Sequence, residues 1–306
     1  MLPKILCIVG ATSSGKTSLG IRIAKKYSGE IINADSRQIY KKISIGTGKP
    51  EGKWGMMNGA QAYIVQDVPH HLMDVIEPTE SWTVTEWRDE ALKEISSIIQ
   101  RGFVPIIVGG TGLYIRALID NPQYPAVPPQ LGFRSAVECK PLEEISKMLL
   151  RLDPDAEQMI DMKNPRRVLR ALEVATYTGK PFTKQQNMGE SLVDAMQIGL
   201  DWTREELYSR IDSEIDSMIA RGWQDEVRDV LKTGIQIDCP AMLSIGYREL
   251  VGDDVTSMCI EKIKRDVRRY AKRQLTWFKH DKRITWASNE NQAMKLVSDF
   301  VGFRHQ

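Results

Sequence analysis

The sequence is poor in the residues from which zinc sites and disulfide frameworks are built. It has four cysteines, Cys7, Cys139, Cys239 and Cys259, and they lie too far apart to form a C-x-x-C pair. Their spacing argues against a zinc site and against a small fold held together by disulfides. This cysteine usage fits a reducing compartment, so we expect a cytoplasmic protein.

Long apolar runs are also absent, and the net charge is only +2. No run approaches the ~20 residues that a membrane-spanning helix needs, and the strand expected directly after Lys4 leaves no room for a cleavable signal. The sequence therefore predicts no membrane segment. Its 306 residues contain no repeat or low-complexity segment and suit one large α/β domain, alone or with an insertion. We expect a monomer.

The most specific motif is a glycine-rich loop near the start of the chain. Residues 10–17 read Gly-Ala-Thr-Ser-Ser-Gly-Lys-Thr, a complete G-x-x-x-x-G-K-[ST] phosphate loop between an apolar run and a helical pattern. In such a loop, backbone N–H groups and the helix N-terminus attract an anion, and Lys16 neutralises the terminal phosphates. Thr17 is expected to place its hydroxyl on Mg²⁺. The loop alone does not distinguish ATP from another phosphorylated ligand.

Three short apolar runs predict parallel strands. They cover residues 5–9, 30–34 and 103–108, and helical patterns at 17–27 and 84–101 separate them. We therefore predict an α/β fold of the P-loop NTPase type, with a parallel sheet, flanking helices and a helical insertion domain. Because the carboxyl ends of parallel strands share one edge, Lys16, Asp35 and Thr111 are expected to face one crevice.

The middle of the chain has a different character from its ends. Residues 121–129 include four prolines, which predicts a linker, and helical patterns follow at 141–152 and 165–178. The second pattern ends at Gly179-Lys180-Pro181, a strong stop signal. A strand-like run at 196–200 is expected to rejoin the sheet. We predict a discontinuous catalytic core, residues 1–119 and 195–306, and a helical insertion, residues 120–194.

Asp35 follows the second predicted strand and has two possible roles. Opposite the phosphate loop, its carboxylate could act as a base on the group that attacks a phosphorylated substrate. Alternatively, it could cap the next helix. Gln38 lies one helical turn further on, and its amide can both donate to and accept from an adenine edge.

Two other motifs are less specific. Residues 109–112 form a second glycine-rich turn, for which a tight strand-to-helix connection is the simplest explanation. His70 and His71 suggest a metal site, but adjacent histidines point in different directions and no further ligand stands at a suitable spacing. Structural packing or lining of a substrate site is the better interpretation.

The segment 262–278 predicts an amphipathic helix with basic residues on one side, interrupted only by Asp266. One-sided positive charge is typical of contact with a nucleic-acid backbone, although an exposed basic helix without a partner has the same pattern. Arg166, Arg167 and Arg170 offer a second basic surface on the insertion. Two function classes remain at this point: a small-molecule kinase that uses ATP, and a transferase that holds another pyrophosphate and acts on nucleic acid.

Taken in order, the motifs resemble those of the tRNA dimethylallyltransferase family, whose members prenylate an adenine beside the anticodon. They span nearly the whole chain. The matching segments are the phosphate loop, Ala34-Asp35-Ser36-Arg37-Gln38-Ile39-Tyr40, Ile45-Gly46-Thr47-Gly48-Lys49-Pro50, His70-His71-Leu72-Met73-Asp74, Val108-Gly109-Gly110-Thr111-Gly112-Leu113-Tyr114, Arg170-Ala171-Leu172-Glu173-Val174, Ile245-Gly246-Tyr247 and Ala271-Lys272-Arg273-Gln274-Leu275-Thr276-Trp277-Phe278.

The resemblance implies a role for each group of residues. Asp35, Lys16 and Thr17 are implied as catalytic, with Asp35 taking a proton from the adenine amine and Thr17 holding Mg²⁺. The residues implied to bind the pyrophosphate of dimethylallyl diphosphate are Gly10, Ala11, Thr12, Ser13, Ser14, Gly15, Lys16, Thr17 and Arg210. Those implied to contact the tRNA anticodon stem-loop are Asp35, Ser36, Arg37, Gln38, Thr111, Arg134, Arg166, Arg167, Arg170, Arg268, Arg269, Lys272 and Arg273.

The implied reaction is transfer of a dimethylallyl group to N6 of adenosine 37 in tRNA. The absence of a D-D-x-x-D sequence argues against the helical prenyltransferase solution to the same chemistry. Glu214 departs from the family, since the pattern R-I-x-x-R usually places an arginine there. The alternatives are prenylation of free adenine nucleotides, a small-molecule kinase, and a tRNA-binding relative that has lost catalysis.

Overall fold

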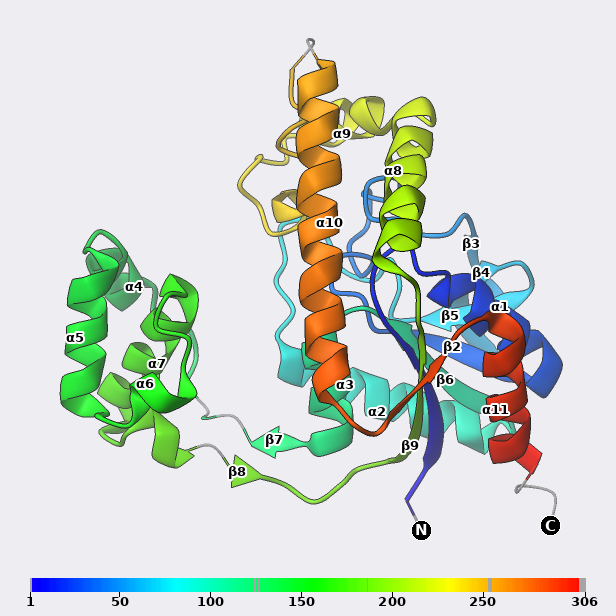
Figure 1. Ribbon diagram of the computed structural model, residues 1–306, viewed down its shortest axis with the longest axis horizontal. Helices are drawn as coiled ribbons and strands as arrows, with labels where there is room; N and C mark the ends of the chain where they lie inside the picture. Colours follow the sequence, from blue (N-terminus) through cyan, green and yellow to red (C-terminus); the bar gives the residue numbers. More distant parts are fainter. Residues whose placement is uncertain (1, 124, 126, 186, 253–254, 303–306) are drawn as a thin grey trace. The chain divides into compact units, whose positions relative to one another are not determined.

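The computed structural model describes residues 2–123, 125, 127–185, 187–252 and 255–302. The chain divides into two compact units, Met1–Ile119 with Leu192–Gln306, and Asp120–Ser191. The first unit contains an eight-stranded mixed sheet in the order β10-β9-β1-β6-β2-β5-β4-β3 (Figure 1). Its strands are β1 (Lys4–Val9), β2 (Gly29–Asn33), β3 (Lys53–Met57), β4 (Ala60–Val65), β5 (Val68–His71), β6 (Val104–Gly109), β9 (Asp194–Leu200) and β10 (Ile284–Ala287).

The sheet is parallel from β10 to β5, and β4 and β3 extend it as an antiparallel hairpin. The helices of this unit are α1 (Lys16–Tyr27), α2 (Val84–Gln100), α3 (Gly112–Asp120), α8 (Arg204–Ala220), α9 (Trp223–Lys232), α10 (Ser257–His280) and α11 (Glu290–Gly302), with a short 3₁₀ turn at Ala241–Leu243. The predicted strands at 5–9, 30–34, 103–108 and 196–200 correspond to β1, β2, β6 and β9.

Both faces of the central strands are covered by helices, which explains their continuous apolar sequence. Alternate residues of β1 enter two cores. Ile5, Cys7 and Val9 pack with α2 and α3, while Leu6 and Ile8 pack with α1 and α11. Parallel strands need crossover helices, and α1 supplies one between β1 and β2 and α2 one between β5 and β6.

A third core packs α8, α9 and α10 together. It contains Ile211 and Ile215 from α8, Trp223 from α9, and Ile263 and Ala271 from α10. Helix α8 begins with a capping box in which Thr203 accepts from the N–H of Glu206 and the Glu206 side chain accepts from Thr203. These helices pack against the loop that follows β2, through Ile39, Tyr40 and Ile43.

The second unit is a small helical body with its own core. It consists of β7 (Pro122–Gln123), α4 (Leu131–Glu138), α5 (Leu142–Leu152), α6 (Ala156–Met159), α7 (Pro165–Thr178), a 3₁₀ turn (Phe182–Gln185) and β8 (Asn187–Met188). Asn164 caps the start of α7, and Gly179, at φ 66°, ends it where the stop signal predicted. The proline-rich stretch predicted as a linker contributes one strand of the β7–β8 pair.

Candidate active site

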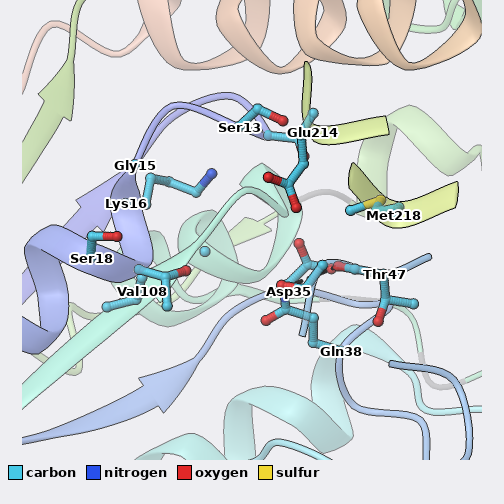
Figure 2. Close-up of a pocket in the computed structure, with 14 residues that line it drawn as sticks. Ser13, Gly15, Lys16, Ser18, Asp35, Gln38, Thr47, Val108, Glu214 and Met218 are labelled. Carbon is cyan, nitrogen blue, oxygen red and sulfur yellow. Dashed lines mark hydrogen bonds between the residues drawn. The ribbon is translucent and has the colours of Figure 1, made fainter. Parts of the chain in front are cut away.

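The carboxyl ends of three neighbouring strands build the candidate site. Because β6 lies between β1 and β2, the phosphate loop after β1, Asp35 after β2 and the glycine turn after β6 meet at one sheet edge. A cavity of about 150 Å³ opens there (Figure 2). Its lining residues are Thr12, Ser13, Gly15, Lys16, Thr17, Ser18, Asp35, Gln38, Thr47, Gly48, Val108, Gly109, Glu214 and Met218.

The phosphate loop has the backbone conformation that anion binding requires. Gly10, Ser13 and Gly15 have φ values of 139°, 58° and 91°, which turn the chain tightly and lead it into α1. The Lys16 ammonium donates to the carbonyl oxygen of Ala11. Burial lowers the pKa of Lys16 to about 8, although the nearby Asp35 carboxylate works in the opposite direction.

Two side chains hold the phosphate loop from outside the cavity. The Trp202 indole N–H donates to the carbonyl oxygen of Ser14 at 2.9 Å, and Nε of Arg210 donates to that of Ser13, also at 2.9 Å. The Arg210 guanidinium lies 4.4 Å from the centroid of the Trp202 ring. Arg210 is not one of the residues that line the cavity. It supports the loop backbone in this structure, and the pyrophosphate contact that the resemblance implied for it stays a prediction.

Asp35 stabilises a turn and also faces the cavity. Its Oδ1 accepts from the backbone N–H of Arg37 at 2.8 Å, so the carboxylate closes a local turn. The same side chain lines the cavity with Lys16 (Figure 2). Residues 36–39 form a turn and not the expected helix. The expected helical spacing between Asp35 and Gln38 is therefore wrong, and another contact must hold Gln38 at the cavity.

A hydrogen-bonded loop places Gln38 at the cavity. Its Nε2 donates to the carbonyl oxygens of Thr47 and Gly48, at 3.2 and 3.0 Å. Glu226 on α9 holds the same loop, because its carboxylate accepts from the backbone N–H groups of Ser44, Ile45 and Gly46 and from the Tyr247 hydroxyl. The motifs at 45–50 and 245–247 thus meet around Glu226.

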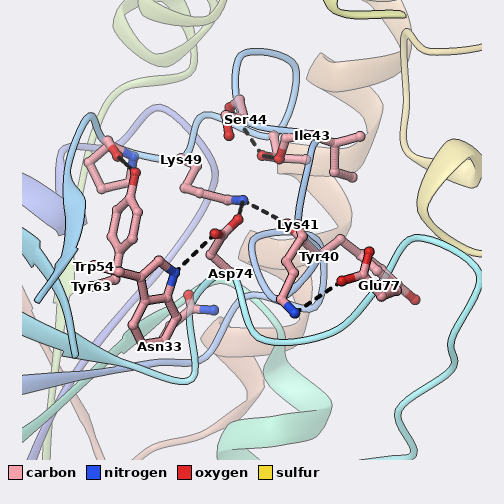
Figure 3. Close-up of polar contacts among 12 residues, drawn as sticks. Asn33, Tyr40, Lys41, Ile43, Ser44, Lys49, Trp54, Tyr63, Asp74 and Glu77 are labelled. Carbon is pink, nitrogen blue, oxygen red and sulfur yellow. Dashed lines mark hydrogen bonds and ion pairs between the residues drawn. The ribbon is translucent and has the colours of Figure 1, made fainter. Parts of the chain in front are cut away.

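A second network closes the end of this loop (Figure 3). The fully buried Lys49 side chain donates to Asp74 Oδ1 at 2.5 Å and to the carbonyl oxygen of Tyr40 at 2.6 Å. The Trp54 indole N–H donates to Asp74 Oδ2 at 3.1 Å. Burial lowers the pKa of Lys49 despite this ion pair. The last residue of the His70–Asp74 motif therefore anchors the loop of the Ile45–Pro50 motif.

The adjacent histidines are structural, in line with the interpretation favoured from the sequence. His70 bonds the carbonyl oxygen of Val68, and burial lowers its pKa to about 4. His71 lies 2.7 Å from Glu30 and 3.1 Å from Glu94. Burial alone lowers the pKa of His71, but its bonds to these two carboxylates outweigh that effect and raise it. Among the described residues, no group of three or more acidic, histidine or cysteine side chains could hold a metal ion.

The arginines of the second unit differ in their availability. Glu173 is fully buried and accepts from Arg134 and Arg170, at 2.8 and 2.7 Å. Hydrogen bonds from these arginines and from the backbone of Gln130 lower the pKa of Glu173 to about 2, against the opposing effect of burial. Arg166 and Arg167 are exposed at the start of α7. Arg134 and Arg170 are therefore committed to internal ion pairs, and Arg166 and Arg167 face solvent.

Ion pairs neutralise part of the positive charge that the sequence predicts for α10. Arg268 makes two 2.8 Å hydrogen bonds to Asp212 on α8, and Lys264 pairs with Asp216 at 2.7 Å. Arg269 lies 3.3 Å from Asp266. Lys272 and Arg273 are exposed. Asp212 and Asp216 lie on α8, so the run 262–278 could not reveal these two partners.

Several contacts in the site were not predicted from the sequence. Gln274 on α10 bonds the backbone N–H of Thr12 and the carbonyl oxygen of Gly110. Met218 and Glu214 approach the cavity from α8, and Thr47 and Gly48 from the loop after β2. Ser36 and Thr111 bond each other, with the Ser36 N–H donating to Thr111 Oγ1 at 2.9 Å. The quoted motifs contained most of these positions, but a motif alone does not say which atom a side chain contacts.

The polar lining of the cavity carries one lysine and two carboxylates, Lys16, Asp35 and Glu214. Glu214 also lies 3.3 Å from Arg221, and that ion pair is partly exposed. An anion of two or more charges needs more positive charge than Lys16 alone supplies. The oxygen donors of Thr17, Asp35 and Glu214 are of the kind that Mg²⁺ prefers, so the residues present fit a magnesium ion that arrives with a phosphorylated ligand.

Comparison with protein families gives a decisive match. A family model described as IPP transferase matches residues 38–281, and one described as isopentenyl transferase matches residues 3–68. The chain belongs to the IPP transferase family. The tRNA dimethylallyltransferase of Geobacillus thermodenitrificans is 43% identical, covering 94% of this chain and 90% of its own length. That of Carboxydothermus hydrogenoformans is 39% identical, covering 98% and 97%. The resemblance drawn from the motifs is confirmed.

Solved structures of family members confirm the predicted fold class. The tRNA isopentenylpyrophosphate transferase from Bacillus halodurans aligns with a TM-score of 0.68 and 33% identity, over 98% of this chain and 96% of that chain. A eukaryotic dimethylallyltransferase, crystallised while acting on tRNA, aligns with a TM-score of 0.76 and 27% identity, over 98% and 79%. Within the described part of the chain, no helix is both long enough and apolar enough to cross a membrane.

Proposed function

We propose that this protein transfers the dimethylallyl group of dimethylallyl diphosphate to N6 of adenosine 37 in tRNA and releases pyrophosphate. The observation that carries the proposal is the cavity that joins the phosphate loop to Asp35. A kinase would need the loop for ATP, but the family relatives are named for prenyl transfer to tRNA. A monomer acting in the cytoplasm on the anticodon stem-loop fits this activity.

The chemistry separates into departure of the diphosphate and attack by the adenine amine. As the allylic C1–O bond breaks, positive charge develops on carbon and negative charge on pyrophosphate. Lys16 and the N–H groups of residues 13–17 would stabilise the leaving group. Mg²⁺ held by Thr17 and the diphosphate oxygens would neutralise further charge there.

Asp35 is suited to take the proton from the amine. An exocyclic amine of adenine is a weak nucleophile, because its lone pair is delocalised into the ring. Removal of an N6 proton as the C–N bond forms would leave a neutral product amine and a protonated Asp35. The adenine must leave its stack to enter a cavity at the sheet edge. Exclusion of water there would protect the allylic cation from hydrolysis.

Ser36, Arg37, Gln38 and Thr111 would help to hold the adenine nucleotide, and Gln38 lines the cavity. Arg37 donates to the carbonyl oxygen of Pro240 at 3.1 Å, which fixes its side chain beside the turn. Lys272 and Arg273 are exposed on α10, and Arg166 and Arg167 on α7. These four are the best candidates for phosphate contacts, because Arg134, Arg170, Arg268 and Arg269 have acidic partners within the protein and Arg37 donates to a backbone carbonyl.

The experiment that tests the proposal uses labelled dimethylallyl diphosphate with three acceptors, unmodified tRNA, AMP and water. We expect label in tRNA alone, and a loss of about 10²- to 10⁴-fold in single-turnover rate for Asp35→Asn. The matched control is Asp299→Asn, an exposed acid on α11. Label in AMP and not in tRNA would favour the adenylate enzyme and contradict the proposal. Binding of tRNA without any transfer would indicate a relative that has lost catalysis.

A further inference from the structure

One buried amide joins the phosphate loop to the second glycine turn. Gln274 is 5% exposed, and its Oε1 accepts from the backbone N–H of Thr12 at 2.8 Å. Its Nε2 donates to the carbonyl oxygen of Gly110 at 2.9 Å. Thr12 belongs to the loop after β1 and Gly110 to the turn after β6. A single side chain on α10 therefore fixes the distance between the two turns.

Only an amide satisfies both partners. A carboxylate would accept from Thr12 but would face the carbonyl oxygen of Gly110 with no hydrogen to donate. The fit is tight, because a Cβ on Gly110 would lie 2.2 Å from Nε2 of Gln274. One helical turn further along α10, Trp277 packs against Gly112, where a Cβ would lie 2.1 Å from its ring. Two side chains of α10, one helical turn apart, therefore pack against the glycine turn.

The contacts continue toward the catalytic carboxylate. Thr111, between the two glycines, bonds Ser36, which follows Asp35 in the chain. The backbone N–H of Thr111 donates to the carbonyl oxygen of Ala34 at 3.1 Å. A connected set of hydrogen bonds therefore runs from Thr12 through Gln274 and Thr111 to the turn that carries Asp35.

We propose that Gln274 is a positioning residue that fixes the phosphate loop relative to the acceptor turn, so that the leaving diphosphate and the attacking amine are aligned. This role rests on the proposed function. Gln274 lies on the helix that carries the candidate RNA contacts, next to the exposed Arg273. The N–H of Thr12 is bonded to Gln274, so the diphosphate binds to the N–H groups of the loop residues after Thr12.

The test compares Gln274→Met, which removes both hydrogen bonds, with Gln274→Glu, which keeps only the acceptor. The control is Thr276→Ala, an exposed residue whose hydroxyl bonds the carbonyl oxygen of Lys272 on the same helix. Three quantities are measured: the melting temperature, the dissociation constant of magnesium pyrophosphate, and the single-turnover rate at saturating donor and tRNA.

We expect Gln274→Met to weaken pyrophosphate binding and to slow single turnover by about 10- to 100-fold, since a small misplacement of reacting groups is costly. Gln274→Glu should fall at least as far, while the affinity for tRNA stays close to that of the wild type because Lys272 and Arg273 remain. A Gln274→Met protein that is folded at the assay temperature and keeps both wild-type values would overturn the assignment.

Failure of the proposed function has a different outcome. If the wild-type protein transfers nothing to tRNA, the activity is wrong, yet the pyrophosphate measurement still decides the role of Gln274. Weaker pyrophosphate binding by Gln274→Met would then support positioning of the phosphate loop, and unchanged binding would contradict it.

Discussion

At the scale of single residues, Glu214 has the largest consequence for anion binding. Its carboxylate lines the cavity with Lys16 and Asp35, at the position where the resemblance led us to expect an arginine. A negative charge near the leaving pyrophosphate must be offset by a cation. The sequence could predict the departure, but it could not show that Glu214 reaches the cavity, since that depends on how α8 packs.

We therefore expect Glu214→Arg to lower the magnesium concentration needed for half-maximal pyrophosphate binding by about tenfold, because the substitution replaces repulsion with attraction. Glu214→Gln should give an intermediate value. Titration calorimetry at several magnesium concentrations measures the effect, with Glu205→Arg, exposed on the same helix, as the control. An unchanged magnesium requirement in Glu214→Arg would show that the carboxylate lies outside the range of the bound anion.

The pH dependence of pyrophosphate binding is set by Lys16. Its pKa is lowered to about 8 in the free protein, and a bound anion favours the charged ammonium. Affinity should therefore be highest below pH 8 and fall as the pH rises from 8 to 9.5. In Lys16→Arg the guanidinium stays charged, so any decline in that variant reports the ligand and not the protein. Equal pH profiles for the two proteins would contradict the lowered pKa.

At the scale of elements, α10 shows how far a sequence pattern can be trusted. The amphipathic pattern predicted the helix correctly, and its one-sided charge was visible. Its neutralisation by Asp212 and Asp216 was not, because those acids lie on α8, about 50 residues earlier in the chain. A local sequence pattern predicts the helix and its charged face. Tertiary packing determines which of those charges are free to bind a phosphate backbone.

The salt dependence of tRNA binding should distinguish available charges from neutralised ones. Replacing Lys272 and Arg273 with glutamine should reduce the slope of log affinity against log salt by about 1.5, the release expected for two lost phosphate contacts. The control replaces Lys25 and Lys295, which are exposed on α1 and α11, with glutamine. Equal slopes for the two double variants would remove α10 from the RNA surface. Filter binding at four or more salt concentrations measures the slopes.

The strands also differ in how well the sequence predicts them. The continuous apolar runs predicted β1, β2, β6 and β9 because a strand buried on both faces needs no polar alternation. The hairpin β3–β4 and the final β10 and α11 were not predicted. Strand β3 is mostly exposed, with Trp54 and Met56 at the surface, so its sequence lacks the signature of a buried strand.

At the scale of the whole molecule, each unit contains one fully buried glutamate. Glu30 accepts from Arg101 and Asn58 and contacts His71 in the first unit, and Glu173 accepts from Arg134 and Arg170 in the second. These hydrogen bonds lower the pKa of both carboxyls to about 2, against the effect of burial. The stability that they contribute is present above about pH 4.5 and is lost as the pH falls toward 2.

Each glutamate should therefore protect its own unit from acid. We expect Glu173→Gln to destabilise the second unit by about 2 kcal/mol at pH 7. The variant should also be less sensitive to acid between pH 4.5 and 2 than the wild type. Calorimetry and limited proteolysis identify which unit unfolds, and Glu30→Gln provides the matched change in the first unit. Identical acid unfolding of Glu173→Gln and the wild type would show that the ion cluster contributes no net stability.

The way the phosphate loop is supported has a consequence for synthesis of the chain. The loop is encoded within the first 17 residues, yet its support comes from β6, from Trp202 and Arg210, and finally from Gln274. During translation the loop lacks its full set of partners until Gln274, 262 residues after Thr12, has been made. Pairings this distant in sequence form slowly, so the motif that is translated first becomes an ordered anion site last.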